Sequence, residues 1–295
     1  MYSDPCRRFV LGVTLAGLSL RLWYSDRSTV ITSEEFDINE RPDWFVQLII
    51  GIGAAEPELI GWDPTIQRMP YDRSDQNATA IYRIIVHGDK DETRVFETCA
   101  LLSDVGAEAF IGRGTRVWVV HEVTADGIDT SKVMVLKDCW VNKERELEGN
   151  ILNDLRAKLA DRPELKNFLS VYTHGIVKRR QGDEIEKDMT TSFPEGAIPA
   201  ADVINVDEVA YFRKGVIPEP PDRQKINSTN ERHGRGHVPS IPSRALGLNA
   251  FGKPEHLEQR YHYRVVFNEK GEPIQGMTSR KRMFIGIQGA FRGKP

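Results

Sequence analysis

The order of short elements between residues 105 and 160 constrains the fold of this chain more than any other feature. Three strand-like stretches and one helical pattern follow one another there, over residues 107–111, 116–123, 132–137 and 142–160. A glycine turn and a short loop, rather than long crossovers, connect the strand-like stretches. Strands with such short connections pair in an antiparallel sheet. We therefore predict an antiparallel sheet with one helix beside it, an α+β arrangement.

The turn between the first two strand-like stretches contains Gly112, Gly114 and Thr115. Because glycine has no Cβ, backbone N–H groups in such a turn can approach the phosphate oxygens of a nucleotide. The longer phosphate-binding loop G-x-G-x-x-G-x-V has a third glycine, and its position is taken here by Val117. Two glycines between strands are also common in turns that bind nothing, so both interpretations stay open.

A lysine and a glutamate follow this turn in positions that suit an ion pair. Lys137 ends the apolar stretch Val-Met-Val-Leu-Lys, where it can act as a point charge on phosphates or extend into water. Glu148 borders the helix face that carries Leu152, and Glu144 lies on the same side one turn earlier. A carboxylate at a buried edge needs a cation. We expect Lys137 to pair with Glu148, with Glu144 as the second candidate.

The first 104 residues are rich in strand patterns. Apolar residues alternate on both sides of Ala16 and Gly17, which predicts a β-hairpin and does not suit a signal peptide. Pro42 opens a helical stripe of apolar residues. Residues 80–86 and 93–101 predict a second hairpin. We expect a β-rich module over residues 1–104.

Residues 181–258 differ in composition from the rest of the chain. They contain eight of the 16 prolines, which favours a long disordered insertion. His233 and His237 are four residues apart, a spacing that binds zinc on a helix. Glycines separate them and no cysteine is close, so a solvated loop is favoured and we expect no metal site. A strand pattern returns at residues 261–267.

The composition bears on partners and location. The formal net charge of −3 gives no general attraction to nucleic acid or to acidic membranes. No stretch approaches the roughly 20 apolar residues that a membrane-spanning helix needs. The three cysteines are odd in number and share no metal-ligand spacing, which suits a reducing compartment. We expect an intracellular protein, cytoplasmic or nuclear, without membrane or nucleic-acid partners.

Several stretches of the sequence resemble the fungal-type protein kinase family. These are RRFVLGVTLAGLSLRLWYSDRS (7–28), ELIGWDPTI (58–66), GRGTRVW (112–118), VLKDCW (135–140), EGNIL (148–152) and YHYRVVFNEKGEPI (261–274). The combination of GRGTRVW with a following KD-x-W is the most distinctive part. The resemblance covers most of the chain outside residues 181–258.

The resemblance implies ATP-dependent phosphorylation of protein hydroxyls, with Mg²⁺ as a further cofactor of the complete fold. It assigns nucleotide binding to Gly112, Gly114, Thr115, Lys137, Glu148, Phe267 and Glu269. Lys137 and Glu148 would be the nucleotide-positioning pair, and residues 267–269 would form the hinge at the adenine. The partners implied are the nucleotide and a protein substrate or binding protein.

The sequence departs from the family pattern after Tyr261. A kinase needs the aspartate of an H-R-D-type loop, an asparagine and a DFG-type aspartate, and none follows in the 35 residues from Tyr261 to Pro295. We therefore assign no catalytic and no metal-binding residue, and expect an incomplete product that is inactive alone. The alternative is a non-catalytic pseudokinase or partner-binding module.

These observations combine into a division of the chain. We predict a β-rich module over residues 1–104 and a kinase-like small lobe over residues 105–180, made of an antiparallel sheet and one helix. A disordered insertion would follow over residues 181–258. Residues 259–295 would form the hinge strand and the incomplete start of a large lobe.

Overall fold

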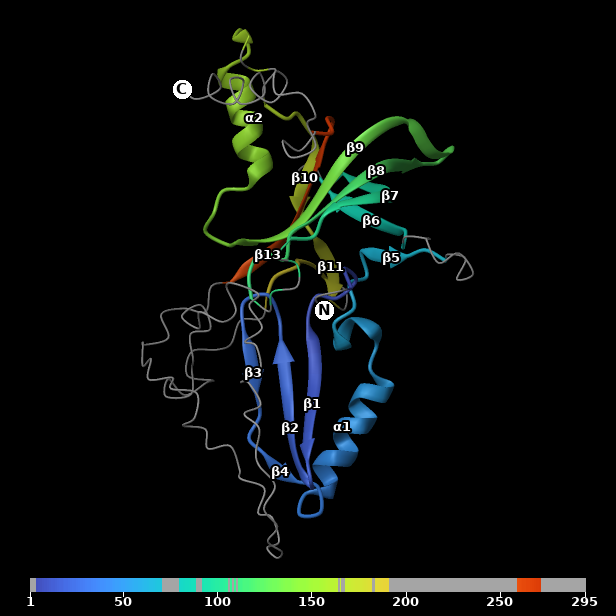
Figure 1. Ribbon diagram of the computed structural model, residues 1–295, viewed down its shortest axis with the longest axis vertical. Coiled ribbons are helices and arrows are strands. Elements are labelled where there is room, and N and C mark those ends of the chain that lie inside the picture. Colours follow the sequence, from blue (N-terminus) through green and yellow to red (C-terminus); the bar gives the residue numbers. More distant parts are fainter. Residues whose placement is uncertain are drawn as a thin grey trace, which may run out of the picture. The chain divides into compact units, whose positions relative to one another are not determined.

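The computed structural model of the chain describes residues 4–70, 80–88, 92–105, 107, 109, 111–163, 165, 168–181, 184–190 and 259–271. These residues all fall within one compact unit. They form three β-sheets, two α-helices and a short 3₁₀ helix (Figure 1). The fold class is α+β, as predicted.

An antiparallel four-stranded sheet comes first in the chain. Its strands are β1 (Val10–Ala16), β2 (Ser19–Ser25), β3 (Val30–Thr32) and β4 (Phe36–Asp37). Strand β2 pairs with each of the other three. The turn between β1 and β2 holds Gly17 at φ 65°, a conformation that favours glycine. The hairpin predicted around Ala16 and Gly17 is confirmed.

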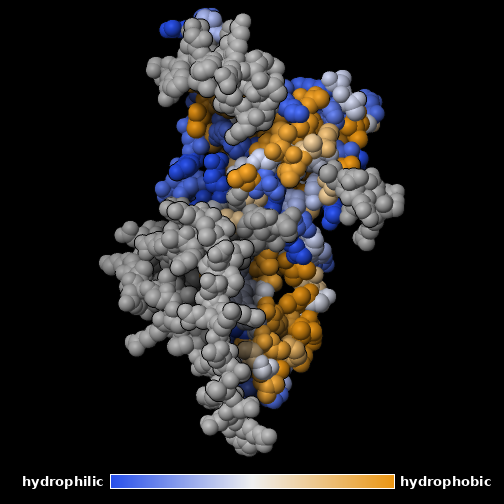
Figure 2. Space-filling view, in the orientation of Figure 1, coloured by the Kyte–Doolittle hydropathy of each residue, from blue (hydrophilic) through white to orange (hydrophobic). Residues whose placement is uncertain are grey.

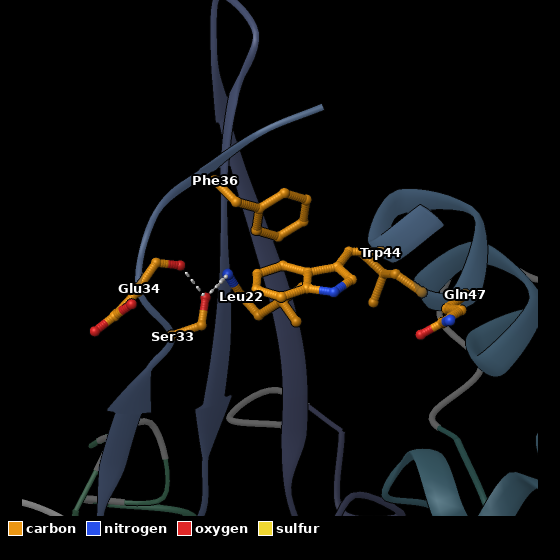
Figure 3. Close-up of a pocket in the computed structure, with 7 residues that line it drawn as sticks. Leu22, Ser33, Glu34, Phe36, Trp44 and Gln47 are labelled. Atoms are coloured by element: carbon orange, nitrogen blue, oxygen red, sulfur yellow. Dashed lines mark hydrogen bonds between the residues drawn. The ribbon is translucent and has the colours of Figure 1, made fainter. Parts of the chain in front are cut away.

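Helix α1 (Pro42–Ala54) starts at its proline, as predicted, because the fixed φ of proline suits the first helical turn. None of its residues is buried, so its apolar stripe is only partly covered, and hydrophobic side chains lie on the surface in this part of the molecule (Figure 2). A groove of about 600 Å³ lies against α1 and is lined by Leu22, Phe36 and Trp44 among others (Figure 3). The rings of Phe36 and Trp44 meet edge to face, with centroids 5.4 Å apart.

A seven-stranded antiparallel sheet contains most of the remaining strands. In spatial order they are β10 (Val171–Ile176), β13 (Arg260–Phe267), β9 (Gly127–Asn142), β8 (Arg116–Thr124), β7 (Thr93–Ser103), β6 (Tyr82–His87) and β5 (Ile66–Arg68). The 3₁₀ helix η1 (Pro57–Ile60) precedes this sheet, and helix α2 (Glu148–Lys158) connects β9 to β10. The hairpin of β11 (Lys178–Gln181) and β12 (Glu184–Lys187) makes the third sheet.

The two faces of the seven-stranded sheet carry separate apolar clusters. In β9, Met134 and Leu136 belong to one cluster, with residues of β6, β7 and β8. Val135 and Cys139 belong to the other, which includes partly buried Leu152 of α2. This alternation follows from the pleat of a strand, which points successive side chains to opposite faces. Lys137 therefore lies on the α2 face of the sheet, and Asp138 on the other.

Two expectations about the segments around the glycine turn are wrong. Described residues between 107 and 111 form no strand, and β7, which ends at Ser103, takes that place in the sheet. The carbonyl oxygens of Ala107 and Ala109 accept hydrogen bonds from Arg27 instead of from a strand. Helix α2 begins at Glu148, not near Asn142, whose side-chain oxygen accepts the N–H of Glu144 in a turn before the helix.

The structure differs from the expected disorder at residues 184–190. Residues 184–187 form β12, and Asp188, which follows directly, is fully buried. The reason is an ion pair between Asp188 and Arg8, which is 180 residues away in the sequence. The composition of a segment gives no information on such a distant contact. The rest of the expected insertion, including His233 and His237, lies outside the described residues.

The proposed division of the chain stays a prediction. The seven-stranded sheet takes strands from both sides of residue 104, so the boundary expected there falls within one sheet. Strand β13 confirms the strand expected at residues 261–267. The terminal segment expected to start a large lobe lies outside the described residues from position 272 onward.

Candidate functional site

Lys137 and Glu148 form the predicted ion pair. Lys137 Nζ donates to Glu148 Oε2 at 2.5 Å, from the middle of the sheet to the first turn of α2. A carboxylate in the first helical turn is also favoured by the helix dipole. The Lys137 side chain is 19% exposed and that of Glu148 is 39% exposed, so the pair is reachable from solvent. Glu144, the second candidate, is exposed in the turn before the helix.

Close packing fixes the end of α2 that carries Glu148. The hydroxyl of Tyr263 in β13 accepts the N–H of Gly149 at 2.8 Å. A Cβ at Gly149 would lie 2.1 Å from the ring of His174 in β10, so only glycine lets the helix approach the sheet this closely. Leu147 and Leu152 pack on the apolar cluster of the same face. The position of Glu148 next to Lys137 is therefore set by the sheet.

The glycine turn has two different sides. Gly112 has φ 131° and Gly114 has φ 52°, both in the region that favours glycine. A Cβ at Gly112 would meet no atom within 4 Å, whereas a Cβ at Gly114 would lie 2.5 Å from the guanidinium of Arg27. The N–H of Gly112 is donated to the carbonyl oxygen of Arg27 at 3.0 Å. The open space for a ligand is therefore beside Gly112. Thr115 follows Gly114, where Arg27 closes the turn, and is half-buried.

Arg113, between the two glycines, is a candidate that the sequence reasoning missed. Its Nη2 lies 3.9 Å from the sulfur of Cys139, which is two residues after Lys137 on the same face. Burial raises the pKa of Cys139 to about 11, so this thiol is neutral. The Arg113 side chain is exposed and adds a second positive charge to the face of Lys137. Its place between the two glycines of the turn predicted to bind phosphate was the signal available in the sequence.

The two residues expected at the adenine hinge have structural contacts. Phe267 is 4% exposed and belongs to the apolar cluster on the α2 face. The carboxylate of Glu269 accepts the N–H of Ser170 at 2.8 Å and its hydroxyl at 2.5 Å, which ties the end of β13 to the start of β10. Strand β13 pairs directly with β9, with Val265 opposite Lys137. The adenine role of these residues stays a prediction.

A set of polar side chains is buried on the opposite face of the sheet, and we call it the buried ionic cluster. Its members are Arg8, Asp63, Thr65, Asp138, Asp188, His262 and Arg264. Buried charges are stable only when they are paired and hydrogen-bonded. The cluster meets this condition through direct contacts among its own members.

His262 lies at the centre of this cluster. Its Nε2 is 2.8 Å from Asp138 Oδ1 and its Nδ1 is 3.0 Å from Asp188 Oδ2. The imidazole stacks on the indole of Trp140, with centroids 4.5 Å apart and an interplanar angle of 5°. Burial lowers the pKa of His262, but the charge of Asp138 and the hydrogen bonds raise it more, to about 9. The protonated ring donates to both carboxylates at neutral pH.

Arg264 and Arg8 complete the charge balance. Arg264 donates Nε to Asp138 at 2.8 Å and Nη2 to Asp63 at 2.9 Å. Arg8 donates Nε to Asp188 at 2.8 Å. Burial raises the pKa of Asp138, but His262 and Arg264 lower it more, so the carboxyl stays ionised. Two arginines and a protonated histidine thus balance three aspartates.

The buried ionic cluster joins four of the six sequence stretches that carry the family resemblance. They contribute Arg8 from 7–28, Asp63 and Thr65 from 58–66, Asp138 from 135–140, and His262 and Arg264 from 261–274. The sequence reasoning missed this cluster. A usable signal was the pair Lys137-Asp138 in an apolar strand, because adjacent strand residues face opposite sides and one charge had to enter the core.

The described residues offer little else for cofactors. They contain no group of three or more His, Cys, Asp or Glu side chains that could hold a metal ion. The groove at α1 and a second cavity of about 380 Å³, lined by Arg8 and Trp140 among others, do not include Lys137. Among the described helices, none combines the length and the apolar character needed to cross a membrane.

Comparison with known proteins identifies one relationship. The family model described as fungal protein kinase matches residues 1–294, nearly the whole chain. No curated protein and no solved structure matches the chain.

Proposed function

Because this chain belongs to the fungal protein kinase family, we propose that it binds ATP at the α2 face of the seven-stranded sheet. The phosphates would lie between the glycine turn and Lys137, with Glu148 holding the lysine in place. The domain division given above is part of this proposal, with the small lobe at residues 105–180.

The observation that carries this proposal is the contact between Lys137 Nζ and Glu148 Oε2 at 2.5 Å. In protein kinases a strand lysine contacts the nucleotide phosphates and pairs with a helix glutamate. In this chain the glycine turn is followed by β8, then by β9 with Lys137, and then by α2 with Glu148. This is the same order along the sequence. Arg113 supplies a second positive charge on this face, which supports phosphate binding further.

The two cofactors of the family fit this chain to different extents. ATP supplies the phosphoryl group, and the Lys137–Glu148 pair and the open side of Gly112 suit its phosphates. Magnesium needs several carboxylate or amide oxygens. The described residues contain no group of three or more His, Cys, Asp or Glu side chains that could hold a metal ion, so we assign no magnesium ligand.

For the family as a whole, the reaction would be transfer of the γ-phosphoryl group to a protein hydroxyl. In this chain we assign nucleotide positioning to Gly112, Gly114, Thr115, Lys137 and Glu148, with residues 267–269 beside the adenine. Transfer also requires a carboxylate that orients the acceptor hydroxyl, and no H-R-D-type motif follows Tyr261. We therefore propose that the 295-residue chain binds nucleotide without transferring phosphate. An intracellular location and a protein substrate or partner stay predictions.

Titration of the purified chain with a fluorescent ATP analogue tests nucleotide binding. Lys137→Ala should raise the Kd at least about tenfold. A tenfold change corresponds to about 1.4 kcal/mol, which is less than a charged contact to phosphate contributes. Glu148→Gln should raise it as well, because the lysine loses its fixed partner. Lys143→Ala is the matched control, since Lys143 is exposed beyond the end of β9 and should bind as wild type does.

Two results would contradict the proposal. One is an analogue that does not bind the wild-type chain at all. The other is binding that Lys137→Ala and Lys143→Ala change equally, which would place the nucleotide away from the Lys137–Glu148 pair.

A further inference from the structure

The turn between β2 and β3 is buried, which is unusual because connecting turns normally run over the surface. The carboxylate of Asp26 accepts the N–H groups of Ser28 at 2.8 Å and Thr29 at 2.9 Å. The N–H of Asp26 is donated to the carbonyl oxygen of Thr29 at 3.0 Å. Arg27, at the tip of this closed turn, is only 1% exposed. A rigid buried turn with an arginine at its tip needs a partner in the fold.

That partner is the segment that leads into the glycine turn. Arg27 Nη1 donates to the carbonyl oxygens of Ala107 at 3.0 Å and Ala109 at 2.8 Å. The carbonyl oxygen of Arg27 accepts the N–H of Gly112 at 3.0 Å. Arg27, in the turn between β2 and β3, thus holds three points of the connection between β7 and β8, whose described residues form no helix or strand.

Gly114 gives independent support for this contact. A Cβ at this position would lie 2.5 Å from Cζ, 2.6 Å from Nε and 2.8 Å from Nη2 of Arg27. Real Cβ atoms do not approach other heavy atoms this closely, and the φ of 52° is also unfavourable for other residues. The second glycine of the turn is therefore explained by the guanidinium packed against it.

The other side of the turn is attached to the strand that carries Lys137. The N–H of Trp140 is donated to the carbonyl oxygen of Arg113 at 2.7 Å. The Arg113 side chain then reaches Cys139, on the face of the Lys137–Glu148 pair. The glycine turn is thus held between Arg27 on one side and β9 on the other.

We infer that Arg27 is a positioning residue for the nucleotide site, in that it fixes the glycine turn beside Lys137. The inference rests on the proposed function, because it assigns the fixed turn to the phosphates of ATP. A loop that is ordered before binding spares the ligand the entropic cost of ordering it. Without the Arg27 side chain, the turn keeps its attachment to β9 but loses its anchors at Ala107 and Ala109.

The first experiment measures the Kd of the fluorescent ATP analogue for Arg27→Ala. We expect the Kd to rise about tenfold or more, which is 1.4 kcal/mol per factor of ten. Added guanidinium ion at low millimolar concentration should restore part of the affinity, because it can occupy the space of the missing side chain. The same ion should not restore affinity to Lys137→Ala. Arg21→Ala is the matched control, because the exposed Arg21 pairs with Glu35 in the same sheet, away from the turn.

A double-mutant cycle with Gly114→Ala tests the contact itself. In the wild-type background the new Cβ meets the guanidinium, so we expect loss of both stability and nucleotide affinity. In the Arg27→Ala background the space is free, and only the backbone strain at φ 52° remains. The second substitution should therefore cost clearly less in the variant than in the wild type.

Hydrogen exchange of the amides at residues 111–115 keeps the inference testable apart from nucleotide binding. Faster exchange in folded Arg27→Ala than in Arg21→Ala, without nucleotide, is the expected result. If the wild-type chain binds no nucleotide, the proposed function fails, while exchange still decides whether Arg27 fixes the turn. Unchanged exchange and unchanged Kd in folded Arg27→Ala, with a binding wild type, would overturn the inference alone. Additive effects of the Arg27 and Gly114 substitutions would overturn it as well.

Discussion

Replacing Asp138 by asparagine tests the buried ionic cluster through its dependence on pH. Asp138 Oδ1 accepts hydrogen bonds from His262 at 2.8 Å and from Arg264 at 2.8 Å, and all three residues are buried. Asparagine keeps the size of the side chain and removes its charge. Breaking a buried ion pair by removing one partner costs about 3–5 kcal/mol, because the remaining charge stays in the core. We expect a loss of this size in the free energy of unfolding near pH 6.5.

The pH dependence follows from the pKa of His262, which folding raises from 6.5 to about 9. A pKa that is raised on folding stabilises the folded state fully below the unfolded-state pKa of 6.5. This stabilisation is lost as the pH rises through the folded-state pKa of about 9. For the wild type the loss amounts to about 3 kcal/mol. In Asp138→Asn the largest interaction that raises the pKa is gone, so the variant should lose much less between pH 6.5 and 9. The difference between the two proteins should therefore shrink as the pH rises.

Urea denaturation at several pH values from 6.5 to 9, followed by tryptophan fluorescence, measures this difference. Trp140 stacks on His262 and reports on the cluster directly. His87 affects stability mainly between pH 4 and 6.5, below the range of this experiment, because burial and the charge of Arg264 lower its pKa from 6.5 to about 4. Asp126→Asn, in the exposed turn between β8 and β9, is the control and should stay within about 0.5 kcal/mol of wild type. A gap between Asp138→Asn and wild type that is equal at pH 6.5 and 9 would refute the pairing of His262 with Asp138.

Two further predictions concern α2 and the reaction. Gly149→Ala should destabilise the protein by at least about 2 kcal/mol in thermal unfolding, because its Cβ would lie 2.1 Å from the ring of His174. Gly51→Ala, in α1 with no atom near its Cβ, should instead gain about 0.5–1 kcal/mol, and equal effects at both sites would refute the packing argument. The 295-residue chain should transfer no phosphate from labelled ATP and magnesium to a generic protein substrate, because no orienting carboxylate of the H-R-D type follows Tyr261. Transfer above background that disappears in Lys137→Ala would show that another carboxylate performs this role.

The parts of the fold that depend on local patterns were predictable from the sequence. The alternation of apolar residues around Gly17 predicted the first hairpin, and Pro42 predicted the start of α1. The Lys137–Glu148 pair was also predictable, since strand and helix periods place both residues at one apolar face. Each of these inferences needed only residues close together in the chain.

Long-range contacts decided the parts that could not be predicted. Residues 107–111 look like a strand, but Arg27, about 80 positions earlier, binds the carbonyl oxygens of Ala107 and Ala109. Asp188 lies in a proline-rich composition that suggests disorder, yet it is buried by Arg8 and His262. Neither contact leaves a periodic trace, because each depends on a single side chain from a distant segment.

Strand β9 serves the two faces of the sheet with consecutive residues. Lys137 belongs to the proposed nucleotide site, and Asp138 belongs to the buried ionic cluster. Loss of one residue from the paired part of β9 would exchange these directions, sending the ammonium toward Arg264 and a carboxylate toward the phosphates. Insertions and deletions in this gene should therefore be tolerated in the hairpin turn at residues 125–126 but not between residues 134 and 140. The proposed binding of ATP and the packing of the buried ionic cluster would therefore be lost through the same one-residue shift.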